Sequence, residues 1–403
     1  MNKFFKKAAI LAFGLGVAMS FTACHSGEGE SLPTWSTSSA AGLTYDLVVE
    51  LNMAPASIKY DGKNGVKQAG SGFVYVFSNV DKDKQLVVTA PAGYKSDFTA
   101  AANKVVSFGD ETAKYIYLTL YPDMTDSSNP EYDATVVKSQ DATSKINTTN
   151  SSANQSNNDN TVVSLEVPAG SGDVEGTDDP FSIYLYTPGN EGGEELEKQD
   201  DAAEVSVLAI ACTPDGASWT DKPEDQRPLV TAVLEKASEL DVKLVNSTNK
   251  AEALTLTYNP ANPDEVSARI PHFSSWYYML NARVVSVKSE EVPVYDNPQR
   301  YVTSGNKYQI KYDRKLGVAA SGNNLPLLVK KYIQVLFGNS SATIKSTYNY
   351  TPQMTGIATE SIKQVKKTLT VKSKNYSFDV TVWGAIKPQV TVYAKTHSGG
   401  ANE

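Results

Sequence analysis

Apolar and polar residues alternate with a period of two in several short stretches of this 403-residue chain. The alternation is clear in residues 115–121, 308–312 and 376–382, and turn-forming pairs such as Asp61-Gly62 lie between apolar runs. A period of two places every second side chain on one face, as a strand with one buried face requires. We therefore expect a mainly β fold, built of tandem β-sandwich domains with a minor α component in the C-terminal region.

Composition divides the chain into successive regions. Residues 43–122 and 161–282 each predict a β-sandwich, whereas residues 123–160 are so rich in Ser, Thr, Asn and Asp that we expect a linker or an inserted loop. Residues 283–403 predict a basic, β-rich C-terminal domain, in which residues 325–338 have the pattern of a helix closed by a glycine.

Two shorter segments carry weaker indications. Residues 229–240 have roughly helical spacing of their apolar side chains and favour a short helix. Residues 86–94 resemble the strand and turn of transthyretin-like sandwiches, which agrees with a sandwich over residues 43–122.

Charge is distributed unevenly along the chain. Residues 24–282 contain 17 bases and 38 acids, whereas residues 283–403 contain 17 bases and seven acids, a net charge of +10. The change supports a boundary near residue 283 and favours anionic partners such as phospholipid head groups or acidic glycans. The densest cluster includes Lys363, Lys366 and Lys367. Alternatively, these lysines line the solvent faces of edge strands and oppose aggregation.

The first residues predict export from the cytoplasm. Three lysines precede the apolar run 8–18, which is too short to span a bilayer of about 30 Å, so residues 1–23 predict a signal peptide. The small residues before Cys24 resemble the lipobox of bacterial lipoproteins. That resemblance implies cleavage before Cys24, acylation of this residue and attachment to a membrane. The alternative is an ordinary secretory signal followed by an incidental cysteine.

Residues 24–42 are rich in Ser, Gly and Thr and predict a flexible stalk. The short acidic stretch over residues 25–30 resembles the export signal of surface-displayed lipoproteins in Gram-negative gut bacteria. This resemblance implies a location on the outer membrane, exposed at the cell surface.

Few residue types suited to catalysis are present. Three histidines and two cysteines make a multi-His or Cys-rich metal site improbable, and no cofactor is expected. The sequence contains neither a G-x-S-x-G nor an H-E-x-x-H motif, and Cys212 has the setting of a buried strand residue. We expect no enzymatic activity. A glycosidase-type pair of carboxylates is the alternative, because the sequence does not give the distances between acidic side chains. Nucleic acid is disfavoured as a partner by the predicted location and by the lack of a binding motif.

The most distinctive motif is the segment His272-Phe273-Ser-Ser-Trp276-Tyr277-Tyr278. It resembles the H-F-S-x-W segment that ends a strand in β-domains of the ZU5 type. The resemblance implies a structural role, with His272 donating a hydrogen bond to a turn and with Phe273 and Trp276 in the core. Alternatively, His272, Trp276, Tyr277 and Tyr278 form a platform for sugars or lipids. The same two interpretations apply to Trp219 and Trp383.

Taken together, these features resemble a group of gut-bacterial surface lipoproteins whose members are described as adhesins or as pore-forming-toxin-like proteins. The leading hypothesis is a lipid-anchored surface protein without catalytic activity that binds a host or dietary glycan or protein. The alternative is a membrane-active, pore-forming-like protein, and a third hypothesis is a glycan hydrolase.

Overall fold

The computed structural model describes residues 44–69, 72–95, 105–109, 111–123, 144–148, 163–168, 182–186, 188, 202–213, 215–321, 325–337 and 341–394. Across these ranges the chain is mainly β and contains one α-helix, which confirms the expected fold class. No helix within them is both long enough and apolar enough to cross a membrane. Cys24, the signal peptide and the stalk lie outside the described residues, so the expectations for them stay predictions.

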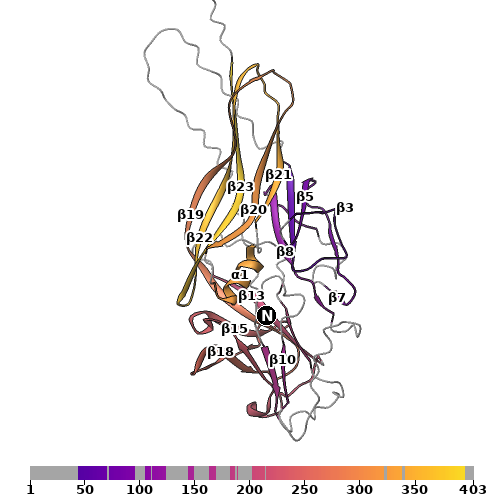
Figure 1. Ribbon diagram of the computed structural model, residues 1–403, viewed down its shortest axis with the longest axis vertical. Helices are drawn as coiled ribbons and strands as arrows, with labels where there is room; N and C mark the ends of the chain where they lie inside the picture. Colours follow the sequence, from indigo (N-terminus) through magenta and orange to yellow (C-terminus); the bar gives the residue numbers. More distant parts are fainter. Residues whose placement is uncertain are drawn as a thin grey trace, which may run out of the picture.

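Two small sheets share one core in the N-terminal region, on the right of Figure 1. Their strand orders are β4-β5-β1-β8 and β3-β2-β6, and β1 runs parallel to β8. Leu47 and Ile116 from the first sheet pack with Ile58 and Leu86 from the second. The bounds are β1 Tyr45–Leu51, β2 Ser57–Tyr60, β3 Lys63–Asn64, β4 Val66–Lys67, β5 Phe73–Val80, β6 Leu86–Thr89 and β8 Ala113–Leu118, with β7 Tyr94–Lys95 and β9 Tyr121–Pro122 as a separate pair.

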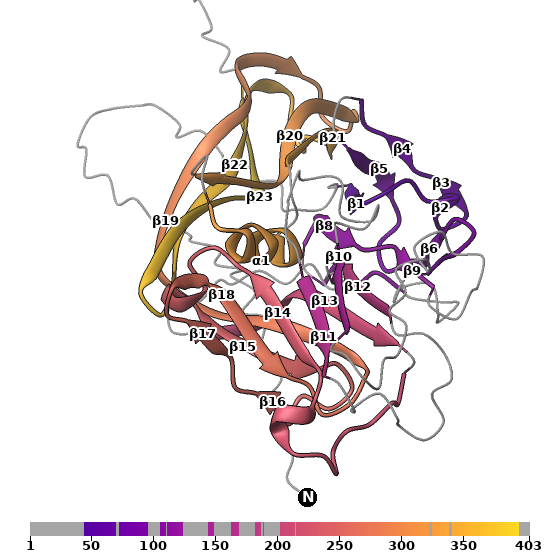
Figure 2. The ribbon, with the colours of Figure 1, turned by 60° about the horizontal axis from the view of Figure 1, so that its bottom comes forward.

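A second sandwich occupies the lower part of Figure 1 and faces the viewer in Figure 2. One of its sheets has the order β10-β11-β14-β18-β17, and the other contains β12, β13, β15, β16 and the start of β19. Leu165, Val230, Ile210 and Trp276 pack between the two sheets. The bounds are β10 Ser144–Thr148, β11 Val163–Val167, β12 Ser182–Tyr186, β13 Ala202–Thr213, β14 Leu229–Val233, β15 Asp241–Asn246, β16 Ala253–Leu254, β17 Thr257–Asn259 and β18 Asn262–Arg269.

Long strands continue from this sandwich to the upper end of the molecule (Figure 1). They are β19 Ser275–Val302, β20 Tyr308–Ser321, β21 Ser341–Tyr350, β22 Gly356–Ser373 and β23 Tyr376–Ala394. Arg283, at the expected domain boundary, lies inside β19 and pairs with Ala202 of β13 on one side and Lys372 of β22 on the other. The regions before and after residue 283 therefore share a strand and a sheet. A change in the sign of side-chain charge does not interrupt the main-chain hydrogen bonds of a strand.

The structure differs from two further expectations. Strand β10 lies within residues 123–160, where a linker or loop was expected, and it pairs with β11. Main-chain pairing allows such a polar segment to join a sheet edge. The expected helix over residues 229–240 is strand β14 followed by a 3-10 turn, Ala237–Glu239. Val230, Ala232 and Leu234 are buried at a period of two, and Lys236 has a left-handed φ of 59°.

The predicted C-terminal helix is confirmed as α1, Leu327–Phe337. Most of its side chains are buried, and it packs against β13 of the second sandwich and β8 of the first. Gln334 of α1 donates a hydrogen bond from Nε2 to the hydroxyl of Tyr117 on β8, at 2.7 Å. The helix thus connects all three parts of the fold.

The long sheet divides into two layers toward its upper end. β20 pairs with β23 only from Gly317 to Ser321, and from Tyr308 to Leu316 it pairs with β21 alone. Gly317 has a φ of 101°, which glycine adopts readily because it has no Cβ atom. The layers enclose a core that includes Val302, Ile310 and Tyr348. We call this part, residues 292–316, 342–364 and 384–394, the distal lobe.

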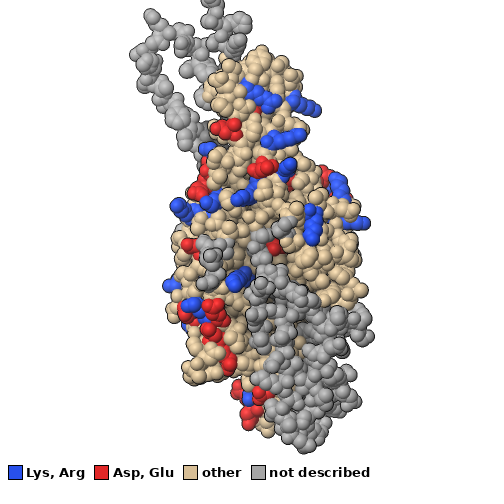
Figure 3. All heavy atoms as spheres, in the orientation of Figure 1, with Lys and Arg blue, Asp and Glu red and all other residues tan. Residues whose placement is uncertain are grey.

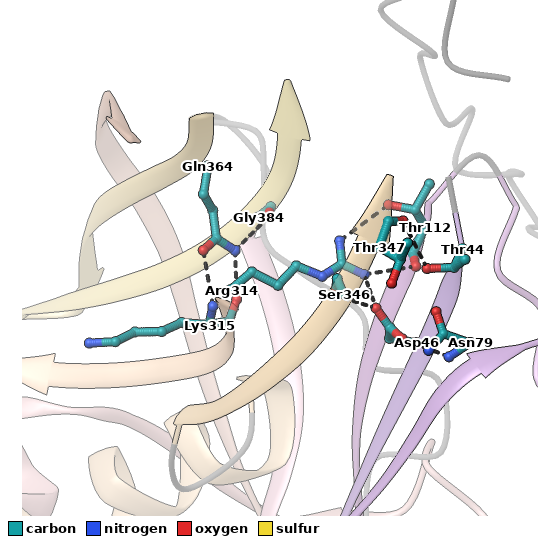
Figure 4. A network of polar contacts seen from close by, with 10 residues as sticks. All are labelled: Thr44, Asp46, Asn79, Thr112, Arg314, Lys315, Ser346, Thr347, Gln364 and Gly384. Carbon is teal, nitrogen blue, oxygen red and sulfur yellow. Dashed lines mark hydrogen bonds and ion pairs between the residues drawn. The ribbon is translucent and has the colours of Figure 1, made fainter. Parts of the chain in front are cut away.

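Gln364 of β22 bridges the strands where they separate (Figure 4). Its Oε1 accepts a hydrogen bond from the amide of Lys315 at 3.0 Å. Its Nε2 donates to the carbonyl oxygens of Lys315, at 2.6 Å, and of Gly384, at 3.2 Å. The buried amide side chain therefore takes the place of the missing main-chain pairing between β20 and β23.

A buried ion pair joins the N-terminal sandwich to the long sheet (Figure 4). Nη2 of Arg314 lies 2.8 Å from Oδ2 of Asp46, and the two side chains are 1% and 0% exposed. Asp46 also accepts hydrogen bonds from the Ser346 hydroxyl at 2.6 Å and the Asn79 amide at 3.0 Å. The guanidinium donates to the carbonyl oxygen of Thr112 at 3.1 Å. Apolar residues surround the pair: Val48, Val74, Leu316, Ala342 and Ile344.

Candidate binding surface

The structure places most of the predicted aromatic platform inside the second sandwich. Trp276 and Tyr278 at the start of β19 are fully buried, and Phe273 is buried with them. Nε1 of Trp276 donates to the carbonyl oxygen of His272 at 3.3 Å. Tyr277, on the other face of the strand, is half-buried. Phe273 and Trp276 thus have the core positions expected of them, whereas Trp276 and Tyr278 do not reach a ligand at the surface.

His272 is paired with an acid. Its Nε2 lies 3.0 and 3.1 Å from the two carboxylate oxygens of Glu252, which follows a turn, and both side chains are about a quarter exposed. No hydrogen bond joins this histidine to a hydroxyl or thiol within the described ranges. The same ranges contain no cluster of three or more metal-ligating side chains.

Cys212 of β13 is buried and forms no disulfide. Burial raises the pKa of its thiol to about 12, so the side chain stays protonated in neutral solution. A protonated, buried thiol is not a nucleophile.

The predicted lysines lie on β22, in the middle part of the long sheet. Nζ of Lys363 lies 3.4 Å from Glu291, and Lys366 donates a hydrogen bond to Glu290. The pKa of Glu290 is lowered by that hydrogen bond, and the pKa of Glu291 is lowered by Lys387 and Lys363. Glu290 and Glu291 therefore offset part of the positive charge that Lys363, Lys366 and Lys387 bring to this part of the sheet.

The three lysines do not form one patch. Lys366 and Lys367 are consecutive on β22, so they point to opposite faces of the sheet. Lys366 instead lies near Trp383 of β23, with its Nζ 5.7 Å from the ring centroid, and Nζ of Lys315 lies 4.9 Å from the same ring. Figure 3 shows Lys and Arg mixed with Asp and Glu over the upper half of the molecule, in agreement with this pairing.

A row of large, exposed side chains crosses the distal lobe. Tyr301 of β19 pairs with Ile357 of β22, which pairs with Tyr393 of β23. These side chains are 62%, 37% and 37% exposed, while their strand neighbours Val302 and Ala358 face the core of the lobe. We call Tyr301, Ile357 and Tyr393 the distal row. Single exposed apolar residues are ordinary, but three adjacent ones on neighbouring strands form a contiguous patch.

A buried carboxylate holds the lobe together beneath the distal row. Glu360 is 1% exposed and accepts hydrogen bonds from the hydroxyls of Tyr350 and, at 3.1 Å, of Tyr295. Arg300 lies 3.7 Å from the carboxylate and stacks on the ring of Tyr308 at 4.9 Å. Burial, followed by the Glu360 carboxylate, raises the pKa of Tyr350. These side chains come from four strands and link both layers of the lobe.

Polar side chains follow the distal row on the outer face of the lobe, and one of them, Asp296 of β19, is an exposed acid that pairs with Ser361. Two residues from Ile357 and Tyr393 along their strands, the same face carries Thr359 and Thr391. Two residues farther on, it carries Ser361 and Gln389. Lysines begin only at the following step, with Lys363 paired to Lys387 across the strands. The face thus changes from aromatic side chains to hydroxyl and amide groups beside the Asp296 carboxylate, and then to two lysines that share Glu291.

Comparison with known proteins gives little further information. No family model matches the sequence, and no curated protein matches it. A crystal structure of a putative pore-forming toxin from Bacteroides vulgatus matches with 14% identity over 54% of this chain and 85% of that chain, at a TM-score of 0.23. A likeness at this TM-score supports no inference about the present chain, so the resemblances to ZU5-type domains and to surface lipoproteins stay predictions.

Proposed function

We propose that the chain is a lipid-anchored binding protein of the outer membrane, displayed at the cell surface, with no catalytic step of its own. It attaches to a host or dietary macromolecule through the outer face of the distal lobe. The anchor is Cys24, and this part of the proposal rests on the lipobox-like sequence before it. The Ser-, Gly- and Thr-rich composition of residues 24–42 favours a flexible stalk, through which the folded part would reach ligands away from the membrane.

The distal row is the observation that carries this proposal. It exposes two tyrosines and an isoleucine side by side on three hydrogen-bonded strands. Contiguous exposed aromatic patches of this kind mark interaction sites in soluble proteins. By contrast, the histidine and the cysteine in the described ranges have structural partners or are buried.

A binding screen tests the proposal directly. The chain from residue 41 onward retains every described strand and is applied to arrays of glycans and of extracellular-matrix proteins. We expect binding to at least one class, reduced in a Tyr301→Ala variant. Mass spectrometry of protein from native envelopes tests the anchor, with an acylated Cys24 expected. No binding to either array contradicts the binding function, and an unmodified cysteine contradicts the anchor.

A membrane-active function is the second candidate, and the net charge of +10 in residues 283–403 favours it. The acids that pair with Lys363, Lys366 and Lys387 weaken this argument, because they cancel part of the local positive potential. Dye release from vesicles of phosphatidylglycerol and phosphatidylethanolamine tests it. Neither leakage nor cosedimentation is expected if the first proposal holds.

A further inference from the structure

We propose that the distal row binds an extended, neutral polysaccharide by stacking Tyr301 and Tyr393 on the apolar faces of its sugar rings. This inference rests on the proposed binding function and assigns its ligand class and its site. The chain of sugars runs across the strands, from β19 over β22 to β23.

The spacing of the row fits such a chain. Tyr301 and Tyr393 occupy the same register on strands that are separated by one strand, β22. Neighbouring strands lie about 4.8 Å apart, so the two tyrosines are about 9.6 Å apart along the hydrogen-bonding direction. This distance is close to the repeat of a disaccharide in an extended pyranose chain. Ile357 between them offers a lower, aliphatic contact to the intervening sugar ring.

The row is preorganised by its supports. Tyr301 follows Arg300, whose guanidinium is held between Glu360 and the ring of Tyr308. Ile357 and Tyr393 belong to strands that are paired over the whole length of the lobe, from residue 356 onward. A rigid platform loses little conformational entropy on binding, which matters for a ligand that makes few contacts.

The neighbouring side chains favour a neutral carbohydrate over an anionic membrane. The two steps next to the row carry Thr359, Ser361 and Gln389, whose hydroxyl and amide groups match the hydrogen-bonding groups of sugars. Asp296 of β19, opposite Ser361, adds a carboxylate that accepts hydrogen bonds from sugar hydroxyls. Lys363 and Lys387, the nearest lysines on this face of β22 and β23, both contact Glu291. Two lysines and one glutamate leave one net positive charge there, and it lies farther from the row than the carboxylate of Asp296, which repels anionic lipid head groups.

The size of the row also favours a carbohydrate over a folded protein. A stable protein interface buries about 800 Å² and 20–30 residues on each partner, far more than three side chains supply. A polysaccharide repeats the same unit many times, so many copies of a membrane-anchored protein bind one chain together. Weak single contacts then add up to firm attachment through effective concentration.

Affinity gel electrophoresis through soluble mixed-linkage β-glucan, xylan and galactomannan tests the inference. We expect at least one of these polymers to retard the wild type. Loss of one stacking ring weakens binding by about 3- to 10-fold in Tyr301→Ala, and Tyr301→Trp retains it. Val66→Ala is the matched control, because Val66 is 71% exposed on the N-terminal sandwich, and its retardation should equal that of the wild type.

The outcomes separate this inference from the proposed function. If no neutral polymer retards the wild type but a matrix protein or a charged glycan binds, the inference is wrong and the binding function stands. If a polymer binds and both Tyr301→Ala and Ile357→Ser bind as the wild type does, the site lies elsewhere and the inference is again wrong. If none of these ligands binds, both fail. Circular dichroism of each variant excludes misfolding as the cause of a loss.

Discussion

The buried ion pair between the N-terminal sandwich and the long sheet gives the sharpest test of how the fold is held together. In Asp46→Ala, Arg314 retains only its contacts with Thr112, at 3.1 and 3.3 Å, and its Nε already has no hydrogen-bond partner. A fully buried guanidinium would then lack a counter-charge. Breaking a buried pair in this way costs about 3–5 kcal/mol, and we expect the upper part of that range.

Substitution of the other partner, Arg314, should cost less free energy of unfolding, because Asp46 has more hydrogen-bond partners left than Arg314 would have. In Arg314→Met, Asp46 keeps the Ser346 hydroxyl and the Asn79 amide as donors. Methionine also fits the surrounding apolar residues, which include Val48 and Leu316. We expect a loss of about 3 kcal/mol, at the lower end of the same range.

The double variant Asp46→Leu/Arg314→Met distinguishes ionic pairing from packing. Replacing a buried ion pair by apolar side chains of similar volume is often neutral or stabilising, so the double variant should lose less than the sum of the single variants. Guanidinium denaturation followed by circular dichroism measures each free energy of unfolding. Lys366→Met removes an exposed pair with Glu290 and is the control, with an unchanged midpoint expected.

Fluorescence adds a second readout. The chain from residue 41 onward lacks Trp35, and its tryptophans, Trp219, Trp276 and Trp383, lie outside the N-terminal sandwich, so its fluorescence reports on the other two parts of the fold. In Asp46→Ala we expect circular dichroism to change at lower denaturant than fluorescence, because the N-terminal sandwich loses its attachment first. A loss below about 1 kcal/mol in Asp46→Ala, or strict additivity in the double variant, would refute the reasoning.

Three further predictions concern buried polar groups. Gln364→Met leaves main-chain groups of Lys315 and Gly384 unsatisfied, so we expect a loss of about 2–3 kcal/mol in denaturant unfolding and faster amide exchange in β20. Because burial raises the pKa of the Cys212 thiol from 9.0 to about 12, a disulfide reagent at pH 8 should react only as the chain unfolds. In the unfolded chain this thiol ionises near pH 9, so stability should fall between pH 9 and 12. Glu360→Gln removes a charge that raises the pKa of Tyr350, so an NMR titration should show a lower pKa for Tyr350 in the variant. Burial should still keep that pKa above the usual value for tyrosine.

Local patterns in the sequence were sufficient for single elements. The alternation over residues 376–382 corresponds to β23, in which Phe378, Val380 and Val382 are buried. The apolar run over residues 325–338 corresponds to α1, because its residues are apolar around most of the helix and the helix is covered on several sides. In such segments, the side chains alone specify both the period and the burial.

Two elements escaped prediction because a competing local effect prevailed. Residues 229–240 have mixed spacing, and the β-branched Val230 and Val233 favour a strand, which ends at Val233. In the turn that follows, Asp264 accepts a hydrogen bond from the amide of Lys236. Strand β10 lies in a polar segment, and its pairing with β11 depends on main-chain groups that carry no sequence signal.

The binding surface and the buried ion pair escaped prediction for a different reason. Tyr301, Ile357 and Tyr393 are far apart in the sequence and meet only through the register of three strands. Asp46 and Arg314 are likewise 268 positions apart. Strand order and register depend on the packing of the whole sheet, so one sequence alone does not reveal them. Tyrosine is common in strands, both buried and exposed, so Tyr301 and Tyr393 give no local signal of their own.

The division of the sheet at Gln364 connects the stability of the lobe with its proposed binding role. Where β20 leaves β23, each strand loses one set of main-chain partners, and the lobe depends on Gln364 at its base and Glu360 near its tip to keep its layers together. Neither side chain belongs to the distal row. Loosening the lobe by Gln364→Met should therefore weaken polysaccharide binding although Tyr301 and Tyr393 are both still present. The conformational entropy lost when the two tyrosines become ordered then reduces the free energy of binding. Equal retardation of this variant and the wild type, combined with the expected loss of stability, would show that the row is organised by its own strand pairing and not by the core beneath it.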